Sequence, residues 1–302
     1  MQEYDNPPGL CRATDKTSDN APTLPREACL PINRCNLPTV ILGGLSFQRH
    51  PTPLKLDGVE DLHRDLFHRL DKTLEIRRRA EIFQDYVTVH FRLEHLDEAG
   101  LTGRSKSRAK ANYMRMIRGW NFDSDSREGA VMKAWVESRF GLLPRYHGGP
   151  IRNLADSDDL ASDTAYRRYQ EMRVRGLYGA NALEAQLDLV YAYCQYEFAR
   201  QTPQQTHLTL YRGVNRLEEY ERLHRIPRFS DSVDARNILL FNNLNSFTGN
   251  PDRAGEFGDY ILTLQVPVAK ILFHNQLLPG ILQGEDEFLV IGGVYEVENA
   301  RV

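Results

Sequence analysis

The hydrophobic positions of this chain repeat with helical spacing through its middle and alternate with strand spacing near its end. From residue 57 to about residue 200, apolar residues return every three or four positions, which is the spacing of an amphipathic helix. Two such stripes are clear, the first formed by Val59, Leu62, Leu66 and Leu70 and the second by Leu183, Leu187, Val190 and Cys194. Because such stripes normally pack into a core, residues 37–205 are predicted to form a helical half.

Alternation begins after residue 201. The segment THLTLYRGV places Leu208, Leu210 and Arg212 on one face of a strand, and DYILTLQVPVAKILF and EFLVIGGVYEV are also typical of strands. The last strand is expected to be short and buried and to end in a turn at Gly292 and Gly293. Residues 206–302 are therefore predicted to form a β-rich core, and the predicted fold class is α+β.

Residues 1–36 follow neither pattern. They carry five prolines and scattered polar residues, so we expect a mobile or loosely docked leader ahead of a single domain over residues 37–302. The apolar content of 41% is enough for a sizeable core. No apolar run approaches the roughly 18 residues of a membrane helix, and no signal peptide is recognisable. We therefore predict a cytoplasmic protein without membrane contact.

Composition narrows the possible chemistry. The four cysteines are too few and too loosely spaced for a disulfide framework or a metal site, and they are predicted to be reduced thiols. The histidine pairs His63/His68 and His90/His95 are each spaced five residues apart, which places the two members of a pair on different faces of a helix. No metal site is therefore predicted. The formal net charge of −3 argues against general nucleic-acid binding.

Two short stretches carry polar side chains on predicted strands. Arg212 lies at the inward-facing end of its strand, and the following Gly213 lets a ligand or a backbone come close. Ser246 and Thr248 lie two residues apart in NSFTGN, which ends in a glycine turn. Each stretch alone is ordinary for a folded protein, and their order along the chain is what makes them informative.

A third stretch, GEDEFLVIGG, places carboxylates at the mouth of a buried strand, where they are costly unless they are paired or used. A period of two puts Glu285 and Glu287 on the same face of the strand and Asp286 on the other. We therefore expect the two glutamates to act together.

Arginine on a first strand, Ser-x-Thr on a second and Glu-x-Glu on a late strand resemble the R-S-E class of mono-ADP-ribosyltransferases. The text RAGEFGDYILTLQVP is similar to that family's Ala-x-x-Phe-Gly helix end and the strand that follows it. The middle motif of most relatives is Ser-Thr-Ser, whereas here it is Ser246-Phe247-Thr248. Upstream, LPTVILGGLSFQRHPTPLKLDGVEDLHRDLFHRL resembles the dinitrogenase reductase ADP-ribosyltransferases of nitrogen-fixing bacteria, which extends the resemblance over most of the chain.

The resemblance implies a helical N-terminal half packed on a two-sheet ADP-ribosyltransferase core, with an NAD cleft between the sheets and NAD+ as co-substrate. Glu287 would stabilise the oxocarbenium-like transition state as nicotinamide leaves, and Glu285 would prepare an arginine acceptor. The guanidinium of Arg212 would bind the pyrophosphate, and Ser246 would orient Glu287 or the ribose.

The loop between Gly249 and Tyr260 is expected to cover the dinucleotide. It contains Arg253 and Phe257, and Phe257 is interpreted either as an aromatic that stacks on nicotinamide or as a core residue that anchors a helix. The predicted NAD-binding set is Arg212, Gly213, Ser246, Thr248, Arg253, Phe257 and Glu287. The resemblance also implies dinitrogenase reductase, the iron protein of nitrogenase, as the substrate whose modification switches off nitrogen fixation, and a PII signalling protein as regulator.

Rival interpretations centre on GRSKSRAKANYMRMIRG, which is rich in arginine and lysine. We favour a solvated basic helix face with Tyr113, Met114 and Ile117 turned inward, over a surface that modifies nucleic acid. A docking face for the protein substrate is a third possibility, and it would be formed by Arg104, Lys106, Arg108 and Lys110. Two alternatives remain, namely transfer of ADP-ribose to another protein and a catalytically inactive module that senses NAD+. A module that only binds NAD+ would have no use for a carboxylate at the ribose, which argues against the inactive module.

Overall fold

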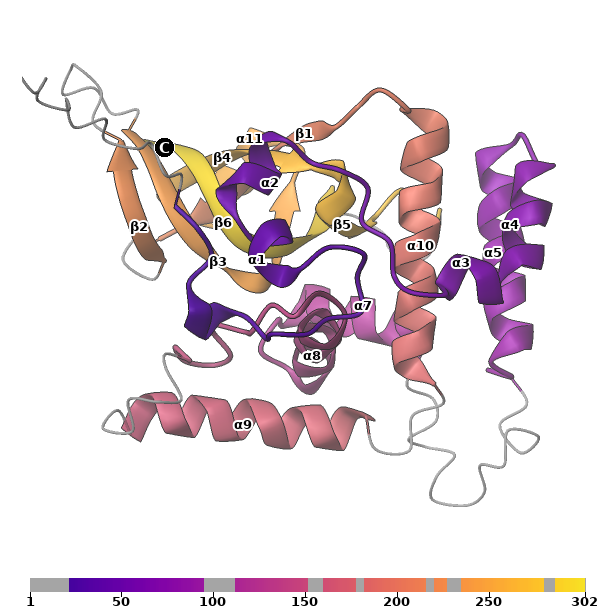
Figure 1. Ribbon diagram of the computed structural model, residues 1–302, viewed down its shortest axis with the longest axis horizontal. Helices are drawn as coiled ribbons and strands as arrows, with labels where there is room; N and C mark the ends of the chain where they lie inside the picture. The colour runs from indigo at the N-terminus through magenta and orange to yellow at the C-terminus, as the bar shows by residue number, and fades with distance from the viewer. Residues whose placement is uncertain are drawn as a thin grey trace, which may run out of the picture.

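The computed structural model describes residues 22–94, 112–151, 160–177, 182–215, 220–226, 235–279 and 286–301, and it places helices first and an antiparallel sheet last (Figure 1). The predicted α+β class is confirmed. The helices before the sheet are η1 (Arg26–Ala28), α1 (Thr39–Leu42), α2 (Leu45–Arg49), α3 (Val59–Leu62), α4 (Arg64–Asp71), α5 (Ile76–His90), α7 (Tyr113–Phe122), α8 (Arg127–Phe140), α9 (Leu160–Leu177) and α10 (Leu183–Gln201).

Six named strands and two short helices make up the C-terminal part of the described chain. They are β1 (His207–Val214), β2 (Glu221–Ile226), β3 (Ala235–Thr248), α11 (Pro251–Gly255), β4 (Tyr260–Pro267), η3 (Val268–Lys270), β5 (Ile271–His274) and β6 (Glu287–Arg301). Strand β6 pairs with β3 along most of its length, and its other edge is shared by β5 near its start and β4 near its end. Strand β1 pairs with β4, and the pair Tyr211 and Thr248 brings β1 back to β3. The ends of β1 and β3 therefore meet although the strands are far apart in the sequence.

The last strand is longer than the sequence predicted. It runs through Gly292 and Gly293 to Arg301, so the expected turn there is wrong. The two glycines lie opposite an irregularity in the β3 pairing, where a Cβ on Gly292 would come within 1.7 Å of the Asn242 carbonyl oxygen. Gly293 has a φ of 117°, which favours glycine, and its neighbour Val294 donates its N–H to the Gly43 carbonyl at 2.7 Å. The glycines thus let β6 continue past a bulge in β3, where Asn242 and Asn243 face the single residue Gly292.

The two predicted helical stripes differ in outcome. All four residues of the second stripe, on α10, are buried, which confirms it. In the first stripe Val59, Leu66 and Leu70 are buried, but Leu62 is 77% exposed, so the prediction for Leu62 is wrong. The helix is interrupted at His63, which separates α3 from α4 and turns Leu62 outward. His63 itself is buried, and its Nδ1 lies 3.0 Å from the Tyr86 hydroxyl.

Part of the segment expected to be a leader is described and packs on the helical half. Leu24 and Ala28 are buried, and the Leu30 N–H donates to the Gly141 carbonyl at 2.7 Å. Residues 1–21 lie outside the described residues. The packing of residues 22–36 therefore begins before the predicted boundary at residue 37.

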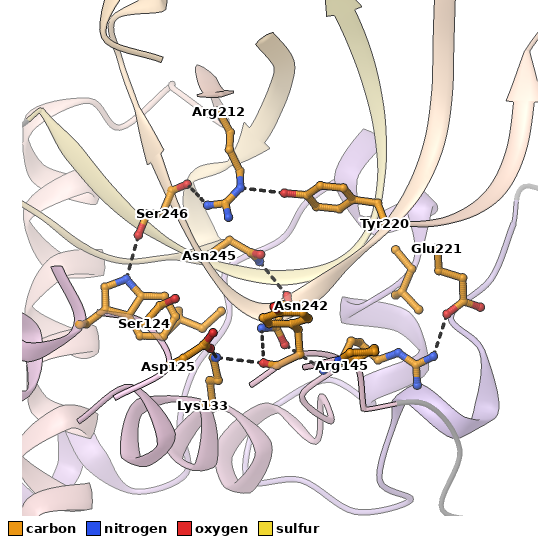
Figure 2. Close-up of a pocket in the computed structure, with 15 residues that line it drawn as sticks. Ser124, Asp125, Lys133, Arg145, Arg212, Tyr220, Glu221, Asn242, Asn245 and Ser246 are labelled. Carbon is orange, nitrogen blue, oxygen red and sulfur yellow. Dashed lines mark hydrogen bonds and ion pairs between the residues drawn. The ribbon is translucent and has the colours of Figure 1, made fainter. Parts of the chain in front are cut away.

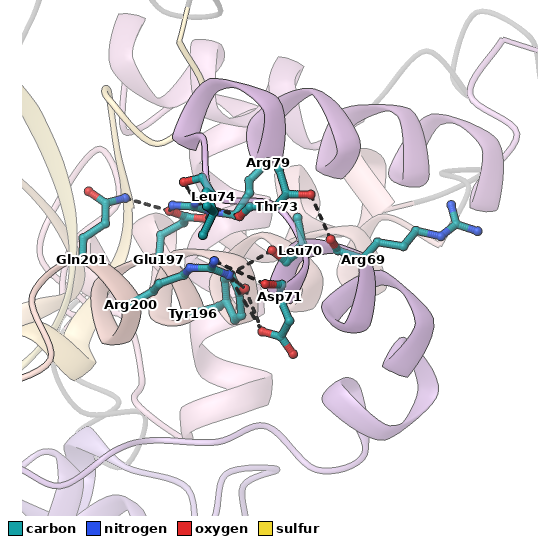
Figure 3. A network of polar contacts seen from close by, with 10 residues as sticks. All are labelled: Arg69, Leu70, Asp71, Thr73, Leu74, Arg79, Tyr196, Glu197, Arg200 and Gln201. Atoms are coloured by element: carbon teal, nitrogen blue, oxygen red, sulfur yellow. Dashed lines mark hydrogen bonds and ion pairs between the residues drawn. The ribbon is translucent and has the colours of Figure 1, made fainter.

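A buried ion pair joins α5 to α10 (Figure 3). Arg79 Nε and Nη2 donate to the two carboxylate oxygens of Glu197 at 2.6 and 2.7 Å, and both side chains are 2% exposed. Arg79 Nη1 donates to the backbone carbonyls of Thr73 and Leu74 at 3.2 and 2.6 Å. The opposite face of α10 contacts β5, so α10 lies between the sheet and the α4–α5 pair (Figure 1). The ion pair thereby fixes the outer helices to the helix that supports the sheet.

Three further observations concern the described residues only. None of their helices is both long and apolar enough to cross a membrane. Cys29, Cys35 and Cys194 are free thiols. No cluster of three or more histidine, cysteine, aspartate or glutamate side chains is arranged to hold a metal ion in the ranges given above.

Candidate functional site

A cavity of about 350 Å³ lies where the ends of β1 and β3 meet the C-terminal end of α7 and the short helix α11. Its lining contains every described residue that the sequence predicted for the site, namely Arg212, Gly213, Ser246, Thr248, Arg253, Phe257 and Glu287. Glu285 lies outside the described residues. The remaining lining residues are Trp120, Asn121, Phe122, Asp123, Ser124, Tyr211, Phe247, Ala254 and Asp286.

Arg212 is held between strands by neutral oxygen atoms. Its Nε donates to the Tyr220 hydroxyl at 2.9 Å, and its Nη1 donates to the Ser246 carbonyl at 2.7 Å (Figure 2). The guanidinium carbon lies 6.0 Å from the centre of the Phe247 ring. Among the described residues no carboxylate forms an ion pair with Arg212, so its positive charge is not neutralised by the protein there. Within the part of the chain that the structure describes, these two bonds use two of the five N–H donors of the guanidinium, and the other three remain for a ligand.

The two hydroxyl residues of β3 each accept a hydrogen bond, one from a distant helix and one from the turn that follows the strand. The indole Nε1 of Trp120 donates to Ser246 Oγ at 2.8 Å, and the backbone N–H of Asn250 donates to Thr248 Oγ1 at 3.1 Å. The strand register places Thr248 directly opposite Glu287, while Ser246 lies opposite Leu289. Sequence reasoning favoured Ser246 as the partner of Glu287, and the register makes Thr248 the nearer cross-strand neighbour.

Gly213 is required by the close approach of two backbones. A Cβ at this position would lie 1.9 Å from the Ala254 carbonyl oxygen, so the glycine lets α11 pack directly on β1. The sequence left open whether a ligand or a backbone approaches Gly213, and the structure shows a backbone. Arg253 on α11 forms an ion pair with Glu256 at 3.2 Å.

Two aromatic rings at the cavity are exposed. Phe257 is 58% exposed, so the interpretation of Phe257 as a buried core residue is wrong, and the ring remains accessible to a ligand. Phe122, at the end of α7, is 93% exposed and lines the same cavity. Exposed aromatic rings of this kind are common at binding sites because they bury a large area on contact.

Several lining residues were not found from the sequence. Trp120 lines the cavity from α7, and Tyr220 acts on it only through its hydrogen bond to Arg212; the sequence marks neither residue as part of a site. Asp286 was expected on the face of β6 opposite to Glu287, yet both line the cavity. The strand begins at Glu287, so the alternation of a strand does not extend to Asp286. The cavity therefore contains three carboxylate side chains, those of Asp123, Asp286 and Glu287.

A second cavity of about 210 Å³ adjoins the first and shares Trp120, Ser124, Arg212 and Ser246 with it (Figure 2). Its other two cations are paired: Arg145 Nη2 lies 2.7 Å from Glu221, and Lys133 Nζ lies 2.8 Å from Asp125. Lys133 Nζ also donates to the Tyr146 carbonyl at 2.9 Å.

Burial and charge shift the pKa values around Lys133. Burial lowers the pKa of Lys133, which is 1% exposed, although Asp125 opposes this effect. Burial alone would raise the pKa of Asp125, but the Lys133 ammonium holds that pKa below its usual range. Burial, together with the Lys133 charge, lowers the pKa of His147 to about 4. The second cavity thus contains two ion pairs in addition to the shared Arg212, whose guanidinium is held by neutral groups.

Comparison with known proteins is in accord with this geometry. The chain matches the model of the dinitrogenase reductase ADP-ribosyltransferase (DRAT) family over residues 32–299. It is 38% identical over 271 residues to the Rhodospirillum rubrum protein named NAD(+)--dinitrogen-reductase ADP-D-ribosyltransferase, and the aligned region covers 88% of this chain and 93% of that relative. No solved structure matches the chain. The chain therefore belongs to the dinitrogenase reductase ADP-ribosyltransferase family.

Proposed function

We propose that this protein transfers ADP-ribose from NAD+ to an arginine of dinitrogenase reductase and releases nicotinamide. Family membership and the name of the Rhodospirillum rubrum relative support the reaction and its substrates. The observation that carries the assignment to a site is the convergence of Arg212, Ser246 and Glu287 on one cavity. Residues from three separate strands would not be expected to meet there by chance.

The predicted two-sheet core stays a proposal, because the described strands pair as one continuous six-stranded sheet in which β6 pairs with β3, β4 and β5. The pair Tyr211 and Thr248 brings β1 and β3 together beside the cavity. We assign the NAD+ cleft to this junction.

Arg212 fits the pyrophosphate of NAD+. Its guanidinium is oriented by Tyr220 and by the Ser246 carbonyl, and its charge is not offset by a carboxylate among the described residues. The remaining N–H donors match phosphate oxygens in geometry as well as in charge. Gly213, Thr248, Arg253 and Phe257 complete the predicted NAD+ site.

Glu287 is assigned to the ribose. When the bond between the ribose C1′ and the nicotinamide nitrogen breaks, its electron pair leaves with nicotinamide and positive charge develops on the sugar. A fixed carboxylate close to this charge stabilises it, and Thr248 lies opposite Glu287 to support its position. The leaving nicotinamide is neutral, so no general acid is required.

An arginine acceptor is supported by the acidic lining. The side chains of Asp123, Asp286 and Glu287 favour the approach of a cationic side chain. The guanidine nitrogen of the acceptor would bond to C1′ and lose a proton, and Glu285 stays the predicted group that receives it. The docking face with Arg104, Lys106, Arg108 and Lys110 lies outside the described residues. Regulation by a PII protein and a cytoplasmic location also stay predictions.

The proposal is tested by Glu287→Gln, with nicotinamide release from NAD+ as the measurement. The substitution keeps the size of the side chain and removes its charge, so both transfer and hydrolysis should fall by about 100-fold or more, the scale of losing one such electrostatic group. Glu296→Gln is a matched control on the same strand, because Glu296 pairs with Arg49 and does not line the cavity. Near-normal hydrolysis by Glu287→Gln would mean that the carboxylate has been misassigned.

A further inference from the structure

Trp120 is the point at which the helical half reaches the strand motif. It lies near the end of α7, is 3% exposed, and lines both adjoining cavities. Its indole Nε1 donates to Ser246 Oγ at 2.8 Å, across more than a hundred residues of sequence (Figure 2). No motif in the sequence singles out this tryptophan.

The chemistry of the two groups fixes the direction of the bond. An indole N–H can only donate, whereas a serine hydroxyl both donates one proton and accepts. Ser246 Oγ is therefore the acceptor from Trp120, and its own proton must be directed to another acceptor. Thr248 Oγ1 is in the same state, because it accepts from the Asn250 N–H. Both hydroxyls on this face of β3 are thus held as donors beside the cavity that contains Glu287.

We propose that Trp120 is a positioning residue that acts through Ser246, and that its indole fixes the serine hydroxyl as a donor toward the ribose or the carboxylate of Glu287. This inference rests on the proposed transfer reaction. A hydroxyl without the indole would be free to rotate, so the same donor would be present but would be aligned for only part of the time.

The surroundings of Trp120 hold the indole in place. Helix α7 is capped at its N-terminus by Asn112, whose side chain accepts from the Arg115 N–H at 3.0 Å. Gly119 packs so closely on α8 that a Cβ there would lie 2.5 Å from the Cβ of Glu128. The ammonium of Lys133, fixed by Asp125, lies 5.8 Å from the centre of the indole. The donor is therefore attached to a packed helix pair rather than to a surface loop.

The chain offers a matched control because it contains only two tryptophans. The second tryptophan, Trp135, is fully buried on α8 and lines neither cavity. Its indole Nε1 donates to Asp188 Oδ1 at 2.7 Å. Trp120→Phe and Trp135→Phe thus remove the same donor from the same half of the protein. We expect Trp120→Phe to lower kcat for nicotinamide release by about tenfold with little change in KM for NAD+, and Trp135→Phe to leave kcat unchanged. Equal losses in both variants would mean a general effect on the fold and would overturn the inference.

A double-mutant cycle tests whether Trp120 acts through Ser246. In a Ser246→Ala background the Trp120→Phe substitution should have no further effect on kcat, because the group that it positions is gone. A full tenfold loss in that background would show that Trp120 acts by another route.

A spectroscopic measurement tests the contact without relying on activity. The protein should give two indole N–H signals in a nitrogen-15 spectrum, which the two Trp→Phe variants assign. Ser246→Ala should shift the Trp120 signal and leave the Trp135 signal in place. If neither signal moves, the contact is absent and the inference fails even where the enzyme is active. If the signal moves but the wild-type protein releases no nicotinamide, the contact stands, and both the transfer reaction and the role of Trp120 in it are rejected.

Discussion

Two arginines, Arg79 and Arg212, differ in what surrounds their charge. Arg79 uses four of its five N–H donors, two on Glu197 and two on backbone carbonyls, and its side chain is 2% exposed (Figure 3). Arg212 uses two donors, both on neutral oxygens, at the edge of two cavities (Figure 2). The hydrogen bonds to Glu197 also raise the pKa of Arg79. Within the described residues, Glu197 neutralises the guanidinium of Arg79, whereas the guanidinium of Arg212 is oriented by neutral groups and has no carboxylate partner.

The difference separates structural from functional charge. An ion pair that is buried and fully hydrogen-bonded has no capacity left for a ligand, and its main effect is that either partner alone is costly. A cation that neutral groups orient keeps its attraction for an anion, and its orientation is fixed before the anion arrives. Mutations at the two sites should therefore affect different quantities, the free energy of unfolding in one case and the KM for NAD+ in the other.

The largest effect is expected from Arg79→Met. The substitution leaves Glu197 buried without its partner, so the free energy of unfolding should fall by about 3–5 kcal/mol. Urea denaturation measures this fall. Nicotinamide release by the folded fraction should keep the KM of the wild type, because Arg79 is far from the cavity lining.

The double variant Arg79→Met with Glu197→Leu is the control. It removes both charges and fills the space with apolar side chains, so most of the lost stability should return. If the double variant is as unstable as the single one, the backbone bonds of Arg79 to Thr73 and Leu74 are the main contribution rather than the ion pair.

The sequence could predict elements whose signal is local. The α10 stripe and the alternation around Arg212 depend on residues within one element, and both are found in the structure. The separation of Arg212, Ser246 and Glu287 along the chain carries no physical information about their distance, and the family resemblance supplied the expectation that they meet. Their convergence on one cavity is a property of the strand pairing.

What the sequence could not predict depends on contacts between distant segments. The bulge that lets β6 continue through Gly292 arises from its pairing with β3, and a single strand contains no signal for it. Trp120 and Tyr220 complete the site through one hydrogen bond each, from residues that look like ordinary core or loop positions. The interruption at His63 likewise left a predicted core leucine exposed, and His63 itself contacts Tyr86 on a helix that lies further along the chain.

Lys133 combines features of the two arginines. It is a buried cation paired with a carboxylate, as Arg79 is, and it lines the same cavity as Arg212. Its neighbour His147 has a pKa of about 4 in the folded protein, against about 6.5 when unfolded. Between these values the unfolded chain binds a proton that the folded protein does not. Stability is therefore present above pH 6.5 and is lost as the pH falls toward 4, by at most about 3 kcal/mol.

The pH prediction is checked with His147→Asn, whose side-chain oxygen can still accept from Lys133 but does not titrate. Urea denaturation between pH 4 and 7 should show a smaller loss of stability for the variant than for the wild type. His274, whose pKa burial lowers to about 4, contributes equally to both proteins. Identical pH profiles would mean that folding does not lower the pKa of His147.

The smallest effect in free energy is expected from Arg212→Lys, and it bears directly on the contrast with Arg79. Lysine keeps the charge but lacks the planar fork, so it cannot hold Tyr220 and the Ser246 carbonyl while also contacting two phosphate oxygens. We expect KM for NAD+ to rise by about tenfold, which corresponds to about 1.4 kcal/mol, with the free energy of unfolding changed by less than about 1 kcal/mol. Tyr220→Phe is the milder companion, because it removes one neutral acceptor while keeping the ring packed on Phe241, and it should raise KM only a few-fold. In the Arg212→Lys background, Tyr220→Phe should add nothing, since the bond that it removes is already lost. An unchanged KM in Arg212→Lys, or a loss of stability like that of Arg79→Met, would place Arg212 with the structural arginines and remove the anchor proposed for NAD+.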